Sequence, residues 1–193
     1  MLSLILASQS PRRADILSLM GYSFSTRAAD ADESSLDHES PLQLVARLAQ
    51  LKAQTVKQSL NNDTIKETVV LAADTIVVIN HLVLGKPADK AEFSTMMQAL
   101  SANTHTVMTA ISVCHGEEIK TMTICTDVTF CQLSDSDIDS YWASGEPRDK
   151  AGGYGIQGIG GQFVKAINGS YSAVVGLPMV ETKELLEEFG VRP

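Results

Sequence analysis

Residues 69–80 read VVLAADTIVVIN, an apolar run of strand length with one acidic residue, Asp74, near its middle. Such a run of Val, Ile, Leu and Ala is typical of a strand in the interior of a sheet. A carboxylate at that position is costly unless it is paired, hydrogen-bonded or bound to a metal. Asp74 is therefore either a structural residue satisfied by the backbone or, as the sharper interpretation, a group that holds a metal or a reacting water.

Strand and helix patterns alternate on both sides of this run, and two strand-like segments then follow each other directly. The predicted strands cover residues 2–7, 22–28, 69–80, 105–115, 120–133, 163–167 and 171–175. The predicted helices cover residues 11–20, 41–60, 90–100, 135–143 and 178–189. Because Gly116-Glu117-Glu118 has the pattern of a hairpin turn, the sheet should hold parallel and antiparallel strands. This predicts a mixed-sheet α/β or α+β fold.

The composition is that of a soluble globular protein. The chain has 193 residues, 44% hydrophobic and 20% charged, without repeats or linkers, so residues 1–193 are expected to form a single domain. The formal net charge of -8 disfavours nucleic-acid binding, and any anionic ligand requires local basic groups or an intervening cation. Three cysteines without a CxxC spacing fit a reduced, cytoplasmic compartment, and we expect neither a signal peptide nor a membrane span.

Residues 8–13, SQSPRR, follow a predicted strand and open a predicted helix. The start of a helix offers unpaired N–H groups and a partial positive charge. The hydroxyls of Ser8 and Ser10 and the guanidinium groups of Arg12 and Arg13 lie beside it, which suits a polyphosphate. The glycine spacing and the lysine of a Walker loop are missing. A capped helix with two solvated arginines is an equally good interpretation of these residues alone.

Four further charged residues are weaker candidates. Lys86 lies between a glycine and a proline in a tight loop, which raises its functional weight. Lys52 lies on the long helix predicted over residues 41–60, where a surface position is the default. Glu33 and its neighbour Asp32 are possible metal ligands, although acidic residues in a polar loop are usually only solvated.

Residues 149–161 read DKAGGYGIQGIGG, a glycine-rich stretch. Glycine lets the backbone approach a ligand closely and adopt positive φ. Gln157, among small and apolar neighbours, offers an amide that can read the edge of a base. A hairpin with bulges is the simpler interpretation. The four histidines show no metal-ligand spacing, and no cysteine has the basic neighbours that a nucleophile needs.

Five segments occur in the order seen in the Maf family of nucleoside triphosphate pyrophosphatases, which the chain resembles over nearly its whole length. The segments are residues 8–13, Ala73-Asp74-Thr75, Gly85-Lys86-Pro87, residues 149–152 and Val175-Gly176-Leu177-Pro178. The resemblance implies an elongated, two-lobed α/β fold with a central cleft, like that of the inosine triphosphate pyrophosphatases. It also implies a divalent cation, Mg²⁺ or Mn²⁺, and a cytoplasmic homodimer.

The same resemblance implies roles for individual residues. Asp74 matches the family's proton acceptor, and Lys52 and Lys86 would act with it on the phosphates. Glu33 and Asp74 would hold the metal. The substrate-binding residues that it implies are Ser8, Ser10, Arg12, Arg13, Thr75 and Gln157.

Three positions distinguish the branches of this family. The branch that resembles a 7-methyl-GTP pyrophosphatase has Trp after the Ser-Pro pair, Asp-Gln at the acidic site and Glu in the late glycine-rich segment. This chain has Arg12, Thr75 and Gln157 there, and so resembles the dTTP/UTP pyrophosphatase branch. The resemblance implies hydrolysis of dTTP and UTP, with CTP or modified pyrimidine nucleotides as further candidates, to the monophosphate and pyrophosphate. Such a reaction sanitises the nucleotide pool.

Two other functions stay open at this point. One is the same chemistry on a methylated purine nucleotide, against which Gln157 argues. The other is a non-catalytic, nucleotide-sensing regulator of cell division, which would use the same phosphate-binding features. Asp74 weighs against the second, because a pure anion binder gains nothing from a carboxylate beside phosphate unless a metal intervenes.

Overall fold

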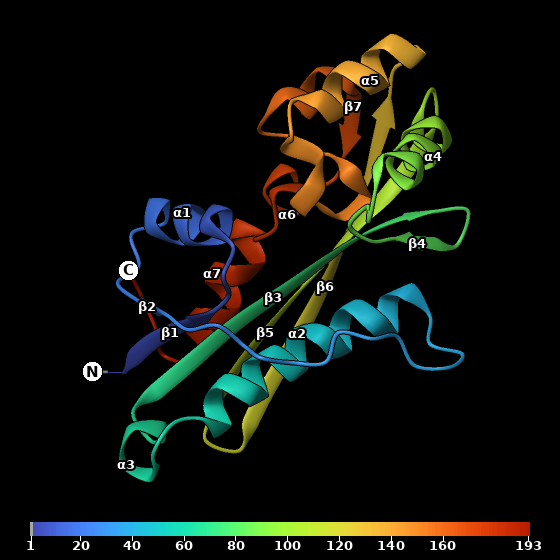
Figure 1. The fold of residues 1–193 in the computed structure, drawn as a ribbon. Helices are drawn as coiled ribbons and strands as arrows, with labels where there is room; N and C mark the ends of the chain where they lie inside the picture. Colours follow the sequence, from blue (N-terminus) through green and yellow to red (C-terminus); the bar gives the residue numbers. More distant parts are fainter. Residues whose placement is uncertain (1) are drawn as a thin grey trace. The chain divides into compact units, whose positions relative to one another are not determined.

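The computed structural model describes residues 2–193, apart from the side chains of residues 62 and 63 (Figure 1). Within this range, strands pair into one sheet in the order β2-β1-β3-β5-β6-β7, and β4 pairs with β3. The strands are β1 (Ser3–Ala7), β2 (Ser25–Thr26), β3 (Thr68–Ile79), β4 (Leu82–Leu84), β5 (Thr104–His115), β6 (Glu118–Phe130) and β7 (Val164–Asn168). β1 is parallel to β2 and β3, whereas the β3–β4 and β6–β7 pairs are antiparallel. The prediction of a mixed sheet is confirmed.

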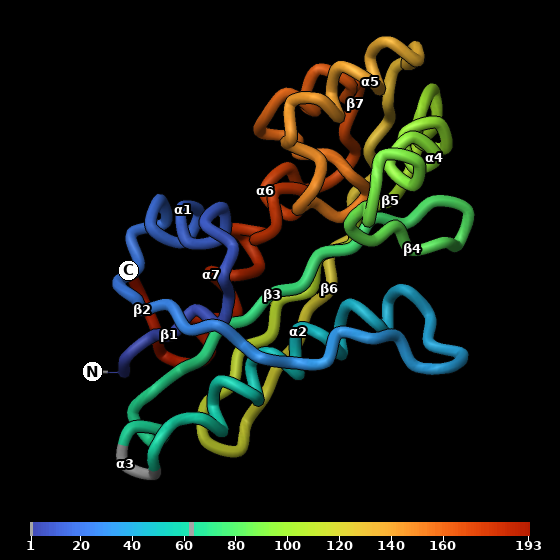
Figure 2. Tube along the Cα trace, viewed as in Figure 1, coloured from blue at the N-terminus to red at the C-terminus, as the bar shows by residue number. Residues whose placement is uncertain are grey.

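Helices occupy most of the segments between the strands. The α-helices are α1 (Pro11–Leu19), α2 (Pro41–Gln58), α3 (Asn62–Ile65), α4 (Lys90–Leu100), α5 (Asp135–Ala143), α6 (Tyr171–Val175) and α7 (Met179–Glu188). The glycine-rich region contains the 3-10 helices η1 (Glu146–Asp149), η2 (Ala151–Gly153) and η3 (Ile159–Phe163). Figure 2 shows the acidic segment that precedes α2 as a long loop without helix or strand.

The chain divides into two compact units. The first unit contains Met1–Asp74, Thr109–Ile124 and Gly176–Pro193, and the second contains Thr75–Met108 and Cys125–Val175. The boundary within β3 therefore falls directly after Asp74. The expectation of a single domain, and the cleft that the family resemblance implies, stay predictions.

In the first unit, the core lies where α2 covers β1 and β3. The helix begins at Ser40, whose hydroxyl accepts a hydrogen bond from the Gln43 amide, while the Gln43 side chain accepts from the Ser40 amide. This capping box satisfies groups that a helix start leaves unpaired. Below the cap, Ala53 and Val56 pack in one cluster with residues of both strands and of β5. The members of this cluster are Ile5, Ala7, Ala53, Val56, Val70, Ala72 and Cys114.

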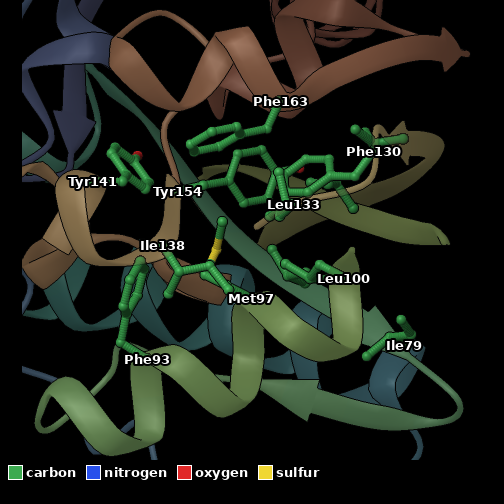
Figure 3. Close-up of a cluster of buried hydrophobic side chains, with 13 residues drawn as sticks. Ile79, Phe93, Met97, Leu100, Phe130, Leu133, Ile138, Tyr141, Tyr154 and Phe163 are labelled. Carbon is green, nitrogen blue, oxygen red and sulfur yellow. The ribbon is translucent and has the colours of Figure 1, made fainter. Parts of the chain in front are cut away.

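In the second unit, aromatic side chains fill the core (Figure 3). Phe93 of α4 stacks at 5.9 Å from Tyr141 of α5, and Phe130 of β6 lies 4.8 Å from Tyr154, between ring centroids. Such tilted and edge-to-face pairs stabilise beyond the area that they bury. Tyr154 belongs to the glycine-rich stretch, so this stretch is anchored in the core.

Two sequence-based predictions are wrong. Residues 171–175 were expected as a strand but form α6, because the Ser170 hydroxyl accepts a hydrogen bond from the Ala173 amide at 3.2 Å and caps a helical turn. The glycine-rich stretch is not a bulged hairpin but a series of short 3-10 turns. The short strand β4 (Leu82–Leu84) had no counterpart among the predicted elements.

Candidate active site

Asp74 is buried at the end of the part of β3 that belongs to the first unit, and it is paired. The Nζ atom of Lys52, on α2, donates to Oδ1 of Asp74 at 2.6 Å. The same Nζ lies 2.8 Å from Oε1 of Glu33. Lys52 is therefore not the surface residue that its helix position favoured, and its ammonium group sits between two carboxylates. The pairing explains how a charged side chain can occupy an apolar strand.

The loop that carries Glu33 is held to α2 by Arg47. The guanidinium of Arg47 donates to both carboxylate oxygens of Glu39, at 2.6 and 2.8 Å, and to the backbone oxygen of Ser34 at 2.9 Å. This bidentate pair raises the pKa of Arg47 and lowers the pKa of Glu39. The sequence assigned Arg47 no role, and its spacing gave no signal, because residues five positions apart on a helix point about 140° away from each other.

Residues at the start of α1 surround a cavity of the first unit. Its volume is about 370 Å³, and its lining consists of Ser8, Gln9, Ser10, Pro11, Ala14, Thr26 and Ala28. The Ser10 amide donates to the Ser8 hydroxyl at 3.1 Å. Within residues 2–193, Ser10 makes no side-chain capping bond to α1. Ser8 and Ser10 therefore lie at the start of the helix, and the anion site that the sequence suggests there stays a prediction.

Arg13 lies on α1 and interacts electrostatically with the carboxylates of Asp74 and Glu33. Its Nε donates to the backbone oxygen of Gly176 at 2.9 Å, and its Nη1 donates to the Ser8 hydroxyl at 3.3 Å. Burial lowers the pKa of Arg13, and the nearby charges of Asp74 and Glu33 act in the opposite direction. Arginine stays protonated despite such a shift, so the site keeps its positive charge. Gly176 was part of a motif in the sequence, but its role as an acceptor follows from the fold alone.

The other predicted residues belong to the second unit. Lys86 is exposed in the loop after β4, and the Gly152 amide donates to the Gly85 oxygen at 2.9 Å, which ties this loop to the glycine-rich stretch. Thr75 follows Asp74 in β3 and is half-buried, and Gln157 is exposed. The predicted site residues thus fall into two groups. The first unit holds Ser8, Ser10, Arg12, Arg13, Glu33, Lys52 and Asp74, and the second holds Thr75, Lys86 and Gln157.

The carboxylates of Glu33 and Asp74 share one cation, the ammonium of Lys52. Two carboxylates are a donor set that suits Mg²⁺ or Mn²⁺ when substrate phosphates complete the coordination. Among the residues that the structure describes, no group of three or more His, Cys, Asp or Glu side chains is placed to hold a metal by itself.

Other chemistry finds less support. Cys114, Cys125 and Cys131 are free, and burial raises the pKa of Cys114 to about 11, so its thiol stays protonated at neutral pH. Over residues 2–193, every helix is too short or too polar to cross a bilayer. The groups that the first unit brings together are the cations of Lys52 and Arg13, the carboxylates of Asp74 and Glu33, and the serines at the start of α1.

A family model described as Maf-like protein matches residues 3–189, and this chain belongs to that family. A protein of Pseudoalteromonas atlantica is 51% identical over 188 residues, which are 97% of each chain. A protein of Aliivibrio fischeri is 48% identical over 184 residues, 95% of this chain and 96% of its own. One from Shigella sonnei is 50% identical over 190 residues, 98% of this chain and 94% of its own. All three bear the name dTTP/UTP pyrophosphatase, so the family resemblance of the sequence is confirmed.

Proposed function

We propose that this chain hydrolyses dTTP and UTP to the nucleoside monophosphate and pyrophosphate, and so acts as a pyrophosphate-releasing hydrolase of the nucleotide pool. Relatives about half identical over nearly the whole chain bear the name of this activity. The observation in the structure that carries the proposal is the buried Asp74 beside two cations, Lys52 and Arg13. A surface that only binds nucleotide gains nothing from a carboxylate beside phosphate unless a metal intervenes.

In this proposal, Asp74 orients a water molecule and accepts its proton as the water attacks the α-phosphorus. Lys52 and Arg13 balance the negative charge that grows on the phosphate oxygens and on the leaving pyrophosphate. Preorganised charges of this kind usually supply the largest part of the rate enhancement in phosphoryl transfer. A carboxylate that acts as a general base contributes about 10²–10⁴-fold.

Glu33 and Asp74 would hold a divalent cation, Mg²⁺ or Mn²⁺, together with the phosphates of the substrate. When bound, the cation neutralises phosphate charge and favours in-line attack. Glu33 is 56% exposed at its side chain, so it can turn from Lys52 to a cation without an opening of the core. The fit of the two carboxylates supports this assignment.

Ser8, Ser10 and Lys86 would bind the phosphate groups. The cavity at the start of α1 supports this for the two serines, because hydroxyls and helix amides are donors for phosphate oxygens. For Lys86, the support is its exposure in a loop tied to the glycine-rich stretch. Its ammonium would act as a point charge on the polyphosphate.

Arg12, Thr75 and Gln157 would select the base. This assignment is supported by the sequence, because these three positions differ from those of the family branch that resembles a 7-methyl-GTP pyrophosphatase. Hydroxyl and amide side chains can pair with the polar edge of a pyrimidine. Larger bases would be rejected by size and by unpaired polar groups.

A product analysis tests the proposed function. The full chain is incubated with dTTP, UTP, CTP, dGTP and 7-methyl-GTP, each with Mg²⁺, with Mn²⁺ and with a chelator. We expect dTMP and UMP with equimolar pyrophosphate, and loss of turnover in the chelator. Release of orthophosphate and diphosphates would place cleavage at the γ-phosphate instead. Binding of dTTP without turnover would favour the nucleotide-sensing regulator, and preference for 7-methyl-GTP would favour the purine branch.

We also propose that the protein works as a cytoplasmic homodimer and binds neither nucleic acid nor membranes. The family resemblance supports the dimer and the compartment, and the net charge of -8 supports the lack of nucleic-acid binding. Light scattering after size-exclusion chromatography should give twice the chain mass of 20.7 kDa. A mass of one chain at micromolar concentration would contradict the dimer.

A further inference from the structure

The Glu146 carboxylate accepts three hydrogen bonds, which come from two parts of the second unit. It belongs to η1, directly after Gly145, and its Oε1 accepts from the Tyr141 hydroxyl at 2.7 Å. Its Oε2 accepts from the Ile159 amide at 2.8 Å, and Oε1 also accepts from the Gly160 amide at 3.1 Å. The carboxylate thus fixes the backbone on the far side of Gln157 to helix α5.

The near side of the same loop is fixed by Tyr141. Its buried hydroxyl accepts a hydrogen bond from the Gly155 amide at 3.1 Å while it donates to Glu146. One connected network therefore binds the backbone amide of Gly155 on one side of Gln157 and the amides of Ile159 and Gly160 on the other. Gln157 itself is exposed. Such a network is strong because all its members are paired and a carboxylate takes part.

The glycines of this loop are required by the network. A Cβ atom on Gly158 would collide with the carboxylate of Glu146, and a Cβ atom on Gly160 would collide with the Tyr141 hydroxyl. At Gly155, a Cβ atom would lie 2.7 Å from Cε of Lys150, the end of a flexible side chain that can move aside, so this glycine is less strictly required. The glycine pattern around Gln157 is thus a consequence of backbone lying directly against these side chains.

The carboxylate is charged at neutral pH. Burial raises the pKa of Glu146, but the hydrogen bonds from Tyr141, Gly160 and Ile159 and the charge of Lys150 together lower it below its ordinary value. An ionised carboxylate accepts from both backbone amides at once. A neutral amide side chain of the same size has one oxygen and one NH₂ group, so it must face at least one of these donors with a donor of its own.

We propose that Glu146 is a positioning residue for base recognition, which holds the loop of residues 155–160 so that the Gln157 amide meets the polar edge of the pyrimidine. This inference rests on the proposed role of Gln157. Glu146 itself touches no part of the nucleotide in this proposal. Its effect is transmitted through the backbone amides that it binds.

The test compares UTP with CTP, which have the same size and differ only in the hydrogen-bonding edge of the base. Dissociation constants are measured by titration calorimetry with the non-hydrolysable α,β-methylene analogues, for the unaltered chain, Glu146→Gln, Gln157→Ala and the double variant. We expect each single variant to lose about tenfold of the preference for the UTP analogue. The double variant should lose no more than Gln157→Ala alone, since Glu146 acts through Gln157.

Gly145→Ala is the matched control. Gly145 has a φ of 79°, and no described atom lies within 4 Å of its Cβ position, so alanine there strains the backbone beside Glu146 without touching the network. This variant should lose stability but keep the preference for the UTP analogue. If Glu146→Gln does not fold, Tyr141→Phe removes one donor to Glu146 and the acceptor of the Gly155 amide, and should lose about threefold of the preference.

Three results would overturn the inference: an unchanged preference in Glu146→Gln, additive losses in the double variant, or equal binding of both analogues by the unaltered chain. Absence of pyrophosphate release from dTTP and UTP would instead refute the proposed activity, because the binding measurement does not depend on turnover. The two failures are therefore separate observations.

Discussion

Lys52 Nζ lies 2.6 Å from Asp74 Oδ1, and the two side chains are only 12% and 9% exposed. Burial removes the hydration of both charges, and the attraction between them compensates for this loss. A surface ion pair stays hydrated and has no such dependence. We expect this ion pair to affect both the stability and the reactivity of the first unit. Substitution of Lys52 tests the contribution of the pair to stability. Substitution of Asp74 by asparagine tests its contribution to turnover.

Lys52→Met should lower the free energy of unfolding by roughly 3 kcal/mol, because it leaves the buried Asp74 carboxylate without the cation that is hydrogen-bonded to it. Urea denaturation measures the change. In the double variant Lys52→Met/Asp74→Asn the uncompensated charge is gone, so most of the loss should be recovered. Additive losses in the double variant would show that the two charges do not depend on each other.

Asp74→Asn should lower kcat for dTTP by about 10²–10⁴-fold while the affinity for the nucleotide stays within a few-fold. The amide keeps the shape of the side chain but cannot accept the proton of the attacking water. Steady-state kinetics and calorimetry measure the two effects. Asp139→Asn, on the exposed surface and paired with Lys90, is the control and should behave like the unaltered chain. Full turnover by Asp74→Asn would remove this residue from the mechanism.

Gly152→Ala should destabilise the second unit by about 2 kcal/mol more than Gly145→Ala. Both glycines have positive φ, 67° and 79°, so both alanines suffer the same backbone strain. Only at Gly152 would the new Cβ lie 2.9 Å from Cβ of Val77. Thermal and urea denaturation of the two variants isolate this collision. Equal losses would show that Val77 moves aside freely.

His105 should make the protein less stable as the pH falls from 6.5 towards 4. Its ring is buried, Nε2 lies 2.8 Å from the Tyr154 hydroxyl, and no described residue gives Nδ1 a partner. Burial lowers the pKa of His105 from 6.5 to about 4, partly offset by Asp127. The unfolded chain therefore binds a proton in this pH range that the folded chain does not, which removes about 3 kcal/mol by pH 4.

The His105→Gln variant is the control for this pH dependence. Glutamine can still bond to the Tyr154 hydroxyl, but it does not titrate. The difference in unfolding free energy between the unaltered chain and this variant should be largest at neutral pH and shrink as the pH approaches 4. A constant difference would mean that His105 takes up its proton at the same pH in the folded protein as in the unfolded chain.

Local signals account for the parts of the fold that sequence predicted well. The capping boxes at Ser40 and Ser134 mark the starts of α2 and α5, and the predicted limits of α4 agree with the structure. Each of these features depends on residues three or four positions apart. The helix at residues 171–175 was missed because its Val-rich sequence favours a strand, and the single hydroxyl of Ser170 decides otherwise.

Prediction of the candidate site was also limited to what local sequence signals indicate. Asp74 was recognisable because a carboxylate in an apolar run is costly, but its partner Lys52 lies on another element and looks like an ordinary helix surface residue. Glu146 gave no signal at all, since its neighbours Gly145 and Pro147 indicate only a turn. Its importance depends on amides thirteen and more positions further along, which sequence patterns do not relate to it.

The division of the chain has a consequence for its biosynthesis. The first unit contains Gly176–Pro193 as well as the beginning of the chain. The hydrogen bond from Arg13 Nε to the Gly176 oxygen can therefore form only after residue 176 has been synthesised. A ribosome must therefore release almost the whole polypeptide before this unit can close, and contacts over such long sequence separations form slowly. A nascent chain stalled before residue 176 should be digested readily by protease in its first 74 residues, whereas the finished chain should resist.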